Sequence, residues 1–208
     1  MARSSIQTYI KDNTALYVFV GVLFVMGVIF GALMVNALSM EQQQDLSRFV
    51  GSFVSSIETG GDTQQRETFF QVFGMHMKWI MLIWLLGISV IGLPLILILD
   101  FLKGVMVGFT VGYLVGEMSW KGMLFALVSV APQNLIIIPA LMIASVSGIA
   151  FSMYMVRNRI MQKRGALAEP FMSYSALTLG ISALLLGISL FEAYVSPVLM
   201  RWVTPMLG

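Results

Sequence analysis

The chain has 208 residues, of which 58% are hydrophobic and only 11% are charged, and its formal net charge is +2. Soluble domains are about 45–50% apolar and about 25% charged, so this composition excludes an ordinary soluble globular protein and indicates helices solvated by lipid. The small net charge, without any basic cluster interleaved with aromatic residues, gives no basis for a nucleic-acid partner.

Cysteine is absent, and the chain has a single histidine, His76. The missing thiols exclude disulfides, thiolate nucleophiles and Cys-based metal sites, and one histidine does not supply the usual His-rich metal or triad arrangements. The sequence also contains no metalloprotease, phosphate-loop or serine-hydrolase motif. We therefore expect a protein that is not an enzyme and that binds neither a cofactor nor a metal.

Five apolar segments predict membrane-spanning helices, because about 20 helical residues cross the hydrocarbon core. They cover residues 16–38, 77–99, 101–117, 134–156 and 174–194. The sequence thus predicts an all-α integral membrane protein with five transmembrane helices in a single polytopic domain, residues 1–208. The third segment is the shortest, and we expect it to cross without tilt, with Lys103 reaching the cytoplasmic interface.

Positive charge between the fourth and fifth predicted spans sets the orientation. The connecting loop carries Arg157, Arg159, Lys163 and Arg164, and short loops rich in lysine and arginine stay in the cytoplasm. Counting back through the crossings places the N-terminus in the cytoplasm and the C-terminus on the extracytoplasmic side. Segment 39–76 is then extracytoplasmic.

Segment 39–76 has the pattern of an amphipathic helical hairpin. Ser39 and Gln42 form a capping box, and apolar residues then recur at helical spacing on both sides of a glycine-containing turn. We expect the resulting apolar stripes to bind a partner protein or to pack against each other; the alternative is that the first helix lies on the membrane surface. The candidate surface comprises Leu46, Phe49, Phe53, Ile57, Phe69, Phe70 and Phe73.

Glycines recur every four residues in the third predicted span, at Gly104, Gly108, Gly112 and Gly116. In water each would weaken a helix by about 1 kcal/mol relative to alanine, whereas in lipid small residues on one face let two helices approach closely. Gly27 and Gly31 form a shorter groove of the same kind in the first span. We expect the two grooves to pack together; a homo-oligomer or a partner's membrane anchor is the alternative occupant.

An apolar segment at 122–131 is left over between the third and fourth predicted spans. It ends at Pro132, Gln133 and Asn134, and Pro139 follows in the first turns of the fourth span. Because proline has no amide hydrogen, we expect a half-helix broken at Pro132, with the two amide side chains satisfying the freed backbone groups. Many transporters build a substrate site at such a break.

Ionisable residues at membrane depth are costly and are candidates for function. Asp100, Glu117 and Glu192 fall at the ends of predicted spans, where headgroup water reaches them, so we expect interface anchors. His76 borders the second predicted span, and an anchoring or hydrogen-bonding role is the simplest interpretation.

Across its length the chain resembles the stage II sporulation protein M family of endospore-forming bacteria. The resemblance lies in GVLFVMGVIFGALMVNALS in the first span, FLKGVMVGFTVGYLVG in the third, and APQNLIIIPALMIASVSGIAFS around the fourth. Wider relatives carry Pro-His-Gly with a glutamate shortly before a second proline. Here Gln133, Asn134 and Ile137 replace the His, Gly and Glu, so we do not transfer any polar chemistry of those relatives to this chain.

The resemblance implies a non-catalytic scaffold for forespore engulfment. In that family the protein sits in the septal membrane and recruits two peptidoglycan hydrolases, an amidase and a lytic transglycosylase, which degrade the wall ahead of the migrating membrane. We therefore expect a multi-pass protein of the septal or engulfing cell membrane, with these hydrolases and the lipid bilayer as its partners. The alternative from another class is a small transporter or channel with its site at the Pro132–Asn134 helix break.

Overall fold

The computed structural model describes the backbone of residues 13–59, 62–157 and 167–203. Within these segments, the side chains that remain undescribed are those of residues 53–54, 56–59, 62–64 and 203. The helical elements are, in chain order, α2 (Thr14–Met34), the 3-10 turn η1 (Val35–Ala37), α3 (Met40–Thr59), α4 (Asp62–Ile88), α5 (Gly92–Ser129), α6 (Ala131–Met155), α7 (Ala168–Leu190), the π-helical turn η3 (Phe191–Val195) and α8 (Ser196–Val203).

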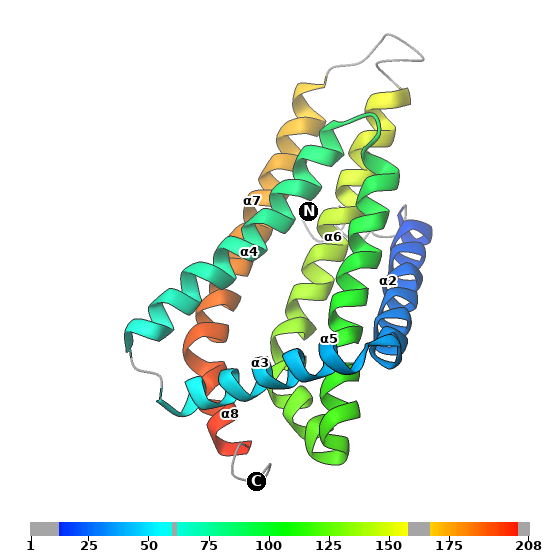
Figure 1. Ribbon diagram of the computed structural model, residues 1–208. Helices are drawn as coiled ribbons and strands as arrows, with labels where there is room; N and C mark the ends of the chain where they lie inside the picture. The colour runs from blue at the N-terminus through cyan, green and yellow to red at the C-terminus, as the bar shows by residue number, and fades with distance from the viewer. Residues whose placement is uncertain (1–12, 60–61, 158–166, 204–208) are drawn as a thin grey trace.

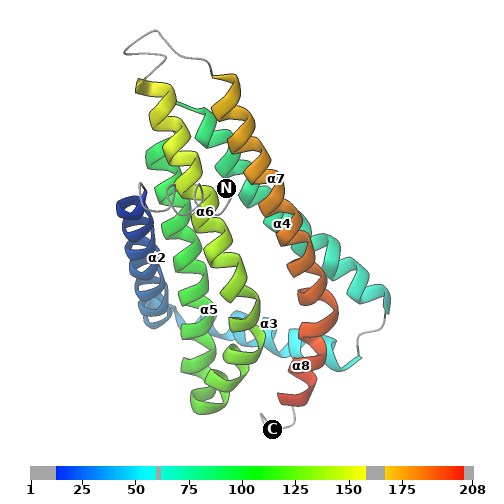
Figure 2. The ribbon, with the colours of Figure 1, turned by 180° about the vertical axis from the view of Figure 1, so that it is seen from behind.

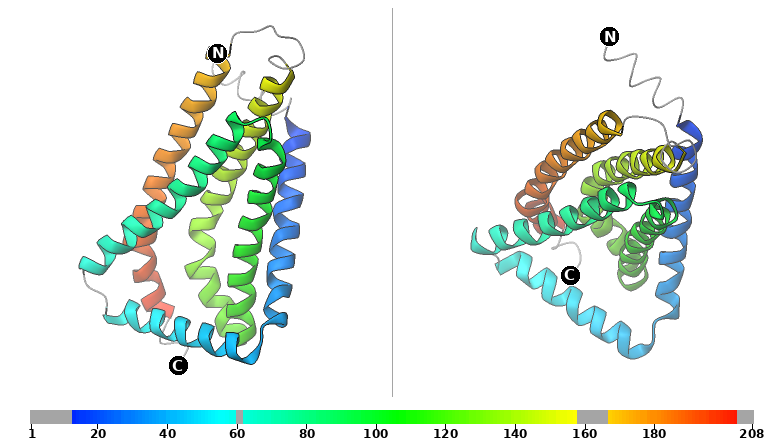
Figure 3. Two further views of the ribbon diagram at one scale, coloured as in Figure 1. Left: turned by 45° about the horizontal axis from the view of Figure 1, so that its top comes forward. Right: turned by 90° about the horizontal axis from the view of Figure 1, so that it is seen from above.

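Within the described part of the chain, five helices are long and apolar enough to cross a membrane, which confirms the predicted number. Helices α2, α5 and α6 stand side by side, and α4 and α7 are inclined to them (Figures 1 and 2). Helix α3 lies across one end of this bundle, and the α4–α5 turn lies at the opposite end (Figure 3). Successive membrane helices therefore run in alternating directions.

The glycine face of α5 packs directly against α2, as predicted. A β-carbon added at Gly104 would lie 3.2 Å from the Cα of Gly27, and one added at Gly108 would overlap the backbone carbonyl of Val28. Gly31 faces the carbonyl of Val105 at a similarly close approach. Two helix backbones can approach this closely only at residues that have no β-carbon. The glycines therefore set the distance between α2 and α5.

The last glycine of the series behaves differently. A β-carbon at Gly112 would still lie 2.9 Å from the Cα of Ala32, whereas one at Gly116 would meet nothing within 4 Å. The groove thus ends one turn earlier than the four-residue spacing predicts. Helix α2 ends at Met34, within one turn of the Ala32 contact, and positions four apart also drift around α5 by about 40° per step, so Gly116 has no partner on α2.

The chain turns between α4 and α5 at Ser89, Val90 and Ile91, inside the segment predicted as the second span. Backbone hydrogen bonds from Ser89 to Leu86 (2.9 Å) and from Gly92 to Ser89 (3.1 Å) close the turn. The prediction of one span over 77–99 is therefore wrong. The second and third membrane helices are Gln65–Ile88 and Gly92–Ser129, so the third is not short.

Helix α5 changes direction at Ser119, which has a positive φ of 52° and a ψ of −127°. The segment beyond it folds back on the segment before it, because a β-carbon on Gly122 would overlap the carbonyl of Leu114. Phe125 and Leu114 belong to one buried apolar cluster. The half-helix predicted over 122–131 is thus present as a returning helical arm, and its break lies at Ser119.

The interruption predicted at Pro132 lies two residues earlier, at Val130 between α5 and α6. Pro132 itself lies in the first turn of α6, where the amides have no intrahelical partner and proline loses no hydrogen bond. Asn134 donates Nδ2 to the carbonyl of Val130 at 2.8 Å, and this amide therefore satisfies a backbone group as expected. Pro139 lies inside α6.

The capping box predicted at Ser39 and Gln42 is confirmed. The backbone amide of Ser39 donates to Oε1 of Gln42 (3.0 Å), and the amide of Gln42 donates to Oγ of Ser39 (3.3 Å), which is a reciprocal capping box. Helix α3 begins there, and α4 continues without interruption from Asp62 into the second membrane helix. Helix α4 therefore carries the chain from the α3 end of the molecule into the membrane bundle as one continuous helix.

Candidate functional site

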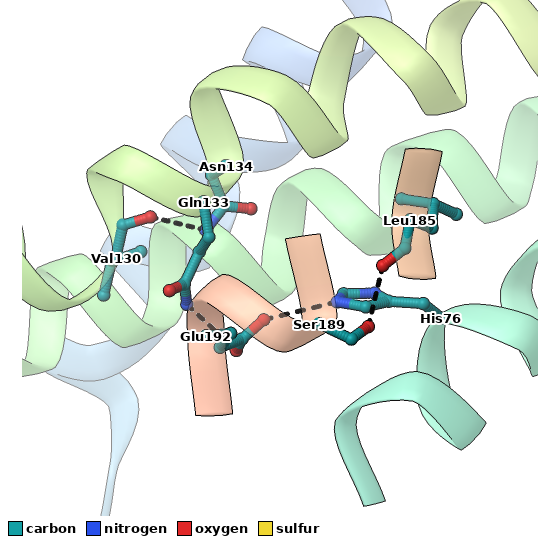
Figure 4. Close-up of polar contacts among 7 residues, drawn as sticks. All are labelled: His76, Val130, Gln133, Asn134, Leu185, Ser189 and Glu192. Carbon is teal, nitrogen blue, oxygen red and sulfur yellow. Dashed lines mark hydrogen bonds and ion pairs between the residues drawn. The ribbon is translucent and has the colours of Figure 1, made fainter. Parts of the chain in front are cut away.

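Three polar side chains from three helices meet inside the bundle (Figure 4). Glu192 Oε2 lies 3.3 Å from Nε2 of His76, and Gln133 donates its amide to Glu192 Oε1 at 3.1 Å. His76 is only 4% exposed, and the Glu192 side chain is 19% exposed. We call His76, Gln133 and Glu192 the polar cluster. It joins α4, the start of α6 and η3, which are far apart in the sequence.

Local structure places Glu192 at this junction. It belongs to η3, a π-helical turn within the last membrane helix, and such turns frequently occur at functional sites. One turn earlier, Ser189 donates to the carbonyl of Leu185 (2.8 Å), so its hydroxyl is satisfied within the helix. Gln133 has a different situation: its Oε1 is buried and has no hydrogen-bond partner among the described residues.

Two other ionisable side chains lie in the middle of α5. Lys103 lies in electrostatic range of Glu192, and its Nζ stands 5.6 Å from the ring centroid of Trp79. Asp100 is 5% exposed and accepts a hydrogen bond of 2.7 Å from Ser145. The prediction that Asp100 anchors an interface is therefore wrong, as is the placement of Lys103 at the end of a span, because both lie inside α5 once the second span ends at residue 88.

A cavity of about 420 Å³ lies next to the polar cluster, between α3, the first half of α4, α5 and the last helix. Its walls are mostly apolar; Leu46 and Phe49 of α3 close one side, and Phe109 and Phe125 of α5 form part of another. Gln133 and Glu192 line it as polar groups, and Arg201 lines it from α8. The size falls within the range of small-molecule sites, about 300–1,000 Å³.

The predicted partner surface is brought together only in part. Phe49 is 68% exposed on α3 and Phe70 is 59% exposed on α4. Phe69 contacts both neighbouring aromatics of α4, with ring centroids 5.3 Å from Phe70 and 5.9 Å from Phe73. Leu46 lines the cavity. The side chains of Phe53 and Ile57, which complete the predicted surface, lie outside the described residues.

Sequence reasoning did not predict the polar cluster. It placed His76 and Glu192 at the extracytoplasmic ends of two predicted spans without pairing them, and it assigned Gln133 to backbone groups. The signal in the sequence is that all three residues fall at the same, extracytoplasmic ends of their predicted spans. Among the described residues, no group of three or more His, Asp and Glu side chains is arranged to hold a metal ion.

The family of the chain can be stated from its overall likeness to known sequences. No curated protein and no solved structure matches it significantly. A family model described as stage II sporulation protein M matches residues 20–197, a range that includes the glycine groove, the polar cluster and the α3–α4 segment. The chain therefore belongs to the stage II sporulation protein M family and is a multi-pass membrane protein of sporulation.

Proposed function

We propose that this protein is a non-catalytic scaffold that recruits an amidase and a lytic transglycosylase to the septal membrane for forespore engulfment. In this proposal the N-terminus is cytoplasmic, and α3 with the start of α4 faces the cell wall. Family membership supports the sporulation setting, and the two hydrolases are the partners that the sequence resemblance implies. The exposed aromatic residues at the α3 end of the molecule supply a surface for them.

The observation that carries the proposal is Phe49, a large apolar side chain that is more than half exposed on α3, outside the five membrane helices. Phe70 is also more than half exposed, in the second turn of the membrane helix Gln65–Ile88. Aromatic residues of this kind are the usual anchors of protein–protein interfaces. The guanidinium of Arg66 lies 5.9 Å from the ring centroid of Phe70, which adds a polar edge of the kind that surrounds such anchors.

The charges on α3 favour a protein partner over a membrane surface. Glu41 and Asp45 are exposed on this helix, and Arg48 lies 3.9 Å from Asp45. Helices that lie flat on a bilayer usually carry lysine and arginine on their polar face, because lipid surfaces are negative or neutral. The acidic residues of α3 suit a basic protein surface instead.

The experiment is a crosslinking purification of the tagged full-length protein from sporulating cells, probed for the amidase and the lytic transglycosylase. Wild-type protein is expected to retain both enzymes. Phe49→Glu and Phe70→Glu each place a charge in the proposed contact and are expected to lose most of the recovered hydrolase. Gln44→Glu is the matched control, because it adds the same charge at another exposed position of α3 and is expected to retain them.

The result that overturns the scaffold proposal is equally direct. If neither hydrolase is recovered with the wild-type protein, recruitment is wrong. If Phe49→Glu and Phe70→Glu retain both enzymes while Gln133→Leu stops engulfment, the surface is misplaced and the transporter alternative at the start of α6 gains support.

A further inference from the structure

The outward face of α4 carries a lysine in the middle of a membrane helix. Lys78 lies thirteen residues after Gln65 and ten before Ile88, which are the ends of the second membrane helix. It is exposed, and no ion pair or hydrogen bond joins it to the described residues. Ionisable residues in membrane helices almost always face the bundle interior and pair there, so the position of Lys78 needs an explanation.

The depth of Lys78 follows from its neighbour in the chain. The ring centroid of Trp79 lies 5.6 Å from Nζ of Lys103, so this turn of α4 is at the level of Lys103 on α5. Lys103 is eleven residues after Gly92, where α5 begins, which is about 16 Å along the helix. Half of the hydrocarbon core is about 15 Å thick, so Lys78 lies near the middle of the bilayer when α5 crosses it. An extended lysine side chain does not reach either headgroup region from that depth.

The residues around Lys78 form a continuous outward face on α4. Gln71, Leu82 and Leu85 are also exposed, and with Lys78 they recur at helical spacing along one side of the helix. A β-carbon added at Gly74, one turn before Lys78, would meet nothing within 4 Å. A glycine on this face lets the backbone of another helix approach closely, as it does where α2 meets α5.

Charge decides what kind of helix covers this face. A lysine surrounded by lipid chains is costly, whereas a carboxylate at the same depth on a neighbouring helix would pair with it. A second copy of this chain does not offer that carboxylate, because Asp100 and Glu192 already have partners inside the bundle. The other acidic residues described in the membrane helices lie near helix starts or the bend at residue 119: Glu67, Glu117 and Glu169.

We propose that the outward face of α4 binds a membrane helix of another protein, whose aspartate or glutamate pairs with Lys78 near the middle of the bilayer. The partner helix crosses α4 at Gly74, and Leu82 and Leu85 pack against its apolar residues. The contact lies inside the membrane, separate from the α3 surface proposed for the hydrolases, and it does not depend on that recruitment.

The test uses the full-length protein in phosphatidylcholine liposomes, with a donor dye on a cysteine introduced at the exposed Val90. The probe is a synthetic single-span peptide of leucine and alanine that carries an acceptor dye and one glutamate at its centre. Matched peptides carry glutamine or lysine there. Energy transfer against peptide content gives the apparent affinity. We expect the glutamate peptide to bind about tenfold more tightly than the glutamine peptide, and the lysine peptide to bind most weakly.

Variants with matched controls locate the contact. Lys78→Leu is expected to remove the preference for the glutamate peptide, and Lys78→Arg to keep it. Arg157→Leu removes the same charge from an exposed residue just after α6 and is expected to behave like wild type. Gly74→Leu places a side chain between the two backbones and is expected to weaken binding about tenfold. Gly180→Leu, at an equally open position on α7, leaves it unchanged.

Four results overturn the proposal. Equal affinity for the glutamate and glutamine peptides would mean that Lys78 meets no carboxylate on this face. A preference that survives in Lys78→Leu would place the contact elsewhere. Loss of the preference when phosphatidylglycerol is added to the liposomes would show that Lys78 reaches lipid headgroups. Energy transfer between two copies of the protein that depends on Lys78 would assign the face to a second copy.

Discussion

Asp100 on α5 and Ser145 on α6 share a hydrogen bond of 2.7 Å that is buried among the membrane helices. The serine pairs with Oδ1, while Oδ2 of the carboxyl group is buried without a hydrogen-bond partner among the described residues. Burying a carboxyl group of this kind costs free energy. The hydrogen bond from Ser145 therefore contributes more to the stability of the fold than an average hydrogen bond does.

Ser145→Ala is expected to lower the free energy of unfolding by about 1–3 kcal/mol, because it leaves the Asp100 carboxyl group without its partner. Ser182→Ala is the control, since that hydroxyl donates to the Thr178 carbonyl of its own helix (2.9 Å) and joins no second helix. Thermal unfolding in detergent measures both. The double variant Asp100→Leu/Ser145→Ala is expected to be more stable than Ser145→Ala alone; a less stable double variant would contradict this account.

The glycine groove predicts unequal effects of one substitution at two positions of the series. Gly108→Val would put a side chain onto the backbone of Val28 and is expected to destabilise the protein by about 1–3 kcal/mol, as overpacking does. Gly116→Val has open space around the new β-carbon and is expected to change stability by less than about 1 kcal/mol. Equal losses in unfolding assays would show that α2 and α5 do not meet along this face.

The α4–α5 turn gives a topology prediction that the hydropathy pattern alone does not. The chain has no native cysteine, so single cysteines can be placed freely. Val90→Cys is expected to react with a membrane-impermeant maleimide only from the cytoplasmic side, and Glu117→Cys only from the outside. A Val90→Cys that is unreactive from both sides would mean that residue 90 is buried in the bilayer, as a span over 77–99 requires.

Glu192 holds two other side chains in place, so its removal should cost more than the loss of one surface carboxylate. Glu192→Leu leaves His76 and the Gln133 amide without their partner, and we expect a loss of about 1–3 kcal/mol in the free energy of unfolding. Glu117→Leu, at an exposed position of α5, is expected to stay within about 0.5 kcal/mol of wild type. A similar loss at both positions would argue against the polar cluster.

Local patterns predicted some features of this molecule well. The Ser39–Gln42 capping box lies within four consecutive residues, and the glycine groove is readable on a single helix, so neither depends on knowing the fold. The pairing of Gly104 with Gly27 was predictable because both grooves have the same spacing. The number of membrane helices followed from hydropathy, which is a property of long segments.

Other features depended on a boundary that hydropathy does not record. Val90 and Ile91 are as apolar as the helices they connect, so the turn between α4 and α5 resembles the inside of a span. Once that boundary is misplaced, Asp100 and Lys103 are assigned to membrane interfaces. The polar cluster was out of reach for a second reason: His76 and Glu192 are 116 positions apart, and their contact exists only in the folded bundle.

The close α2–α5 contact has a mechanical consequence for α3. Because α2 and α5 are joined backbone to backbone, they can move only as one body, and α3 is attached to that body at its first residue. Its other end leads into α4, which packs against α6, α7 and α5. Helix α3 therefore bridges the α2–α5 pair and α4 at one end of the bundle, and any change in the tilt of α4 relative to that pair rotates or shifts the exposed Phe49.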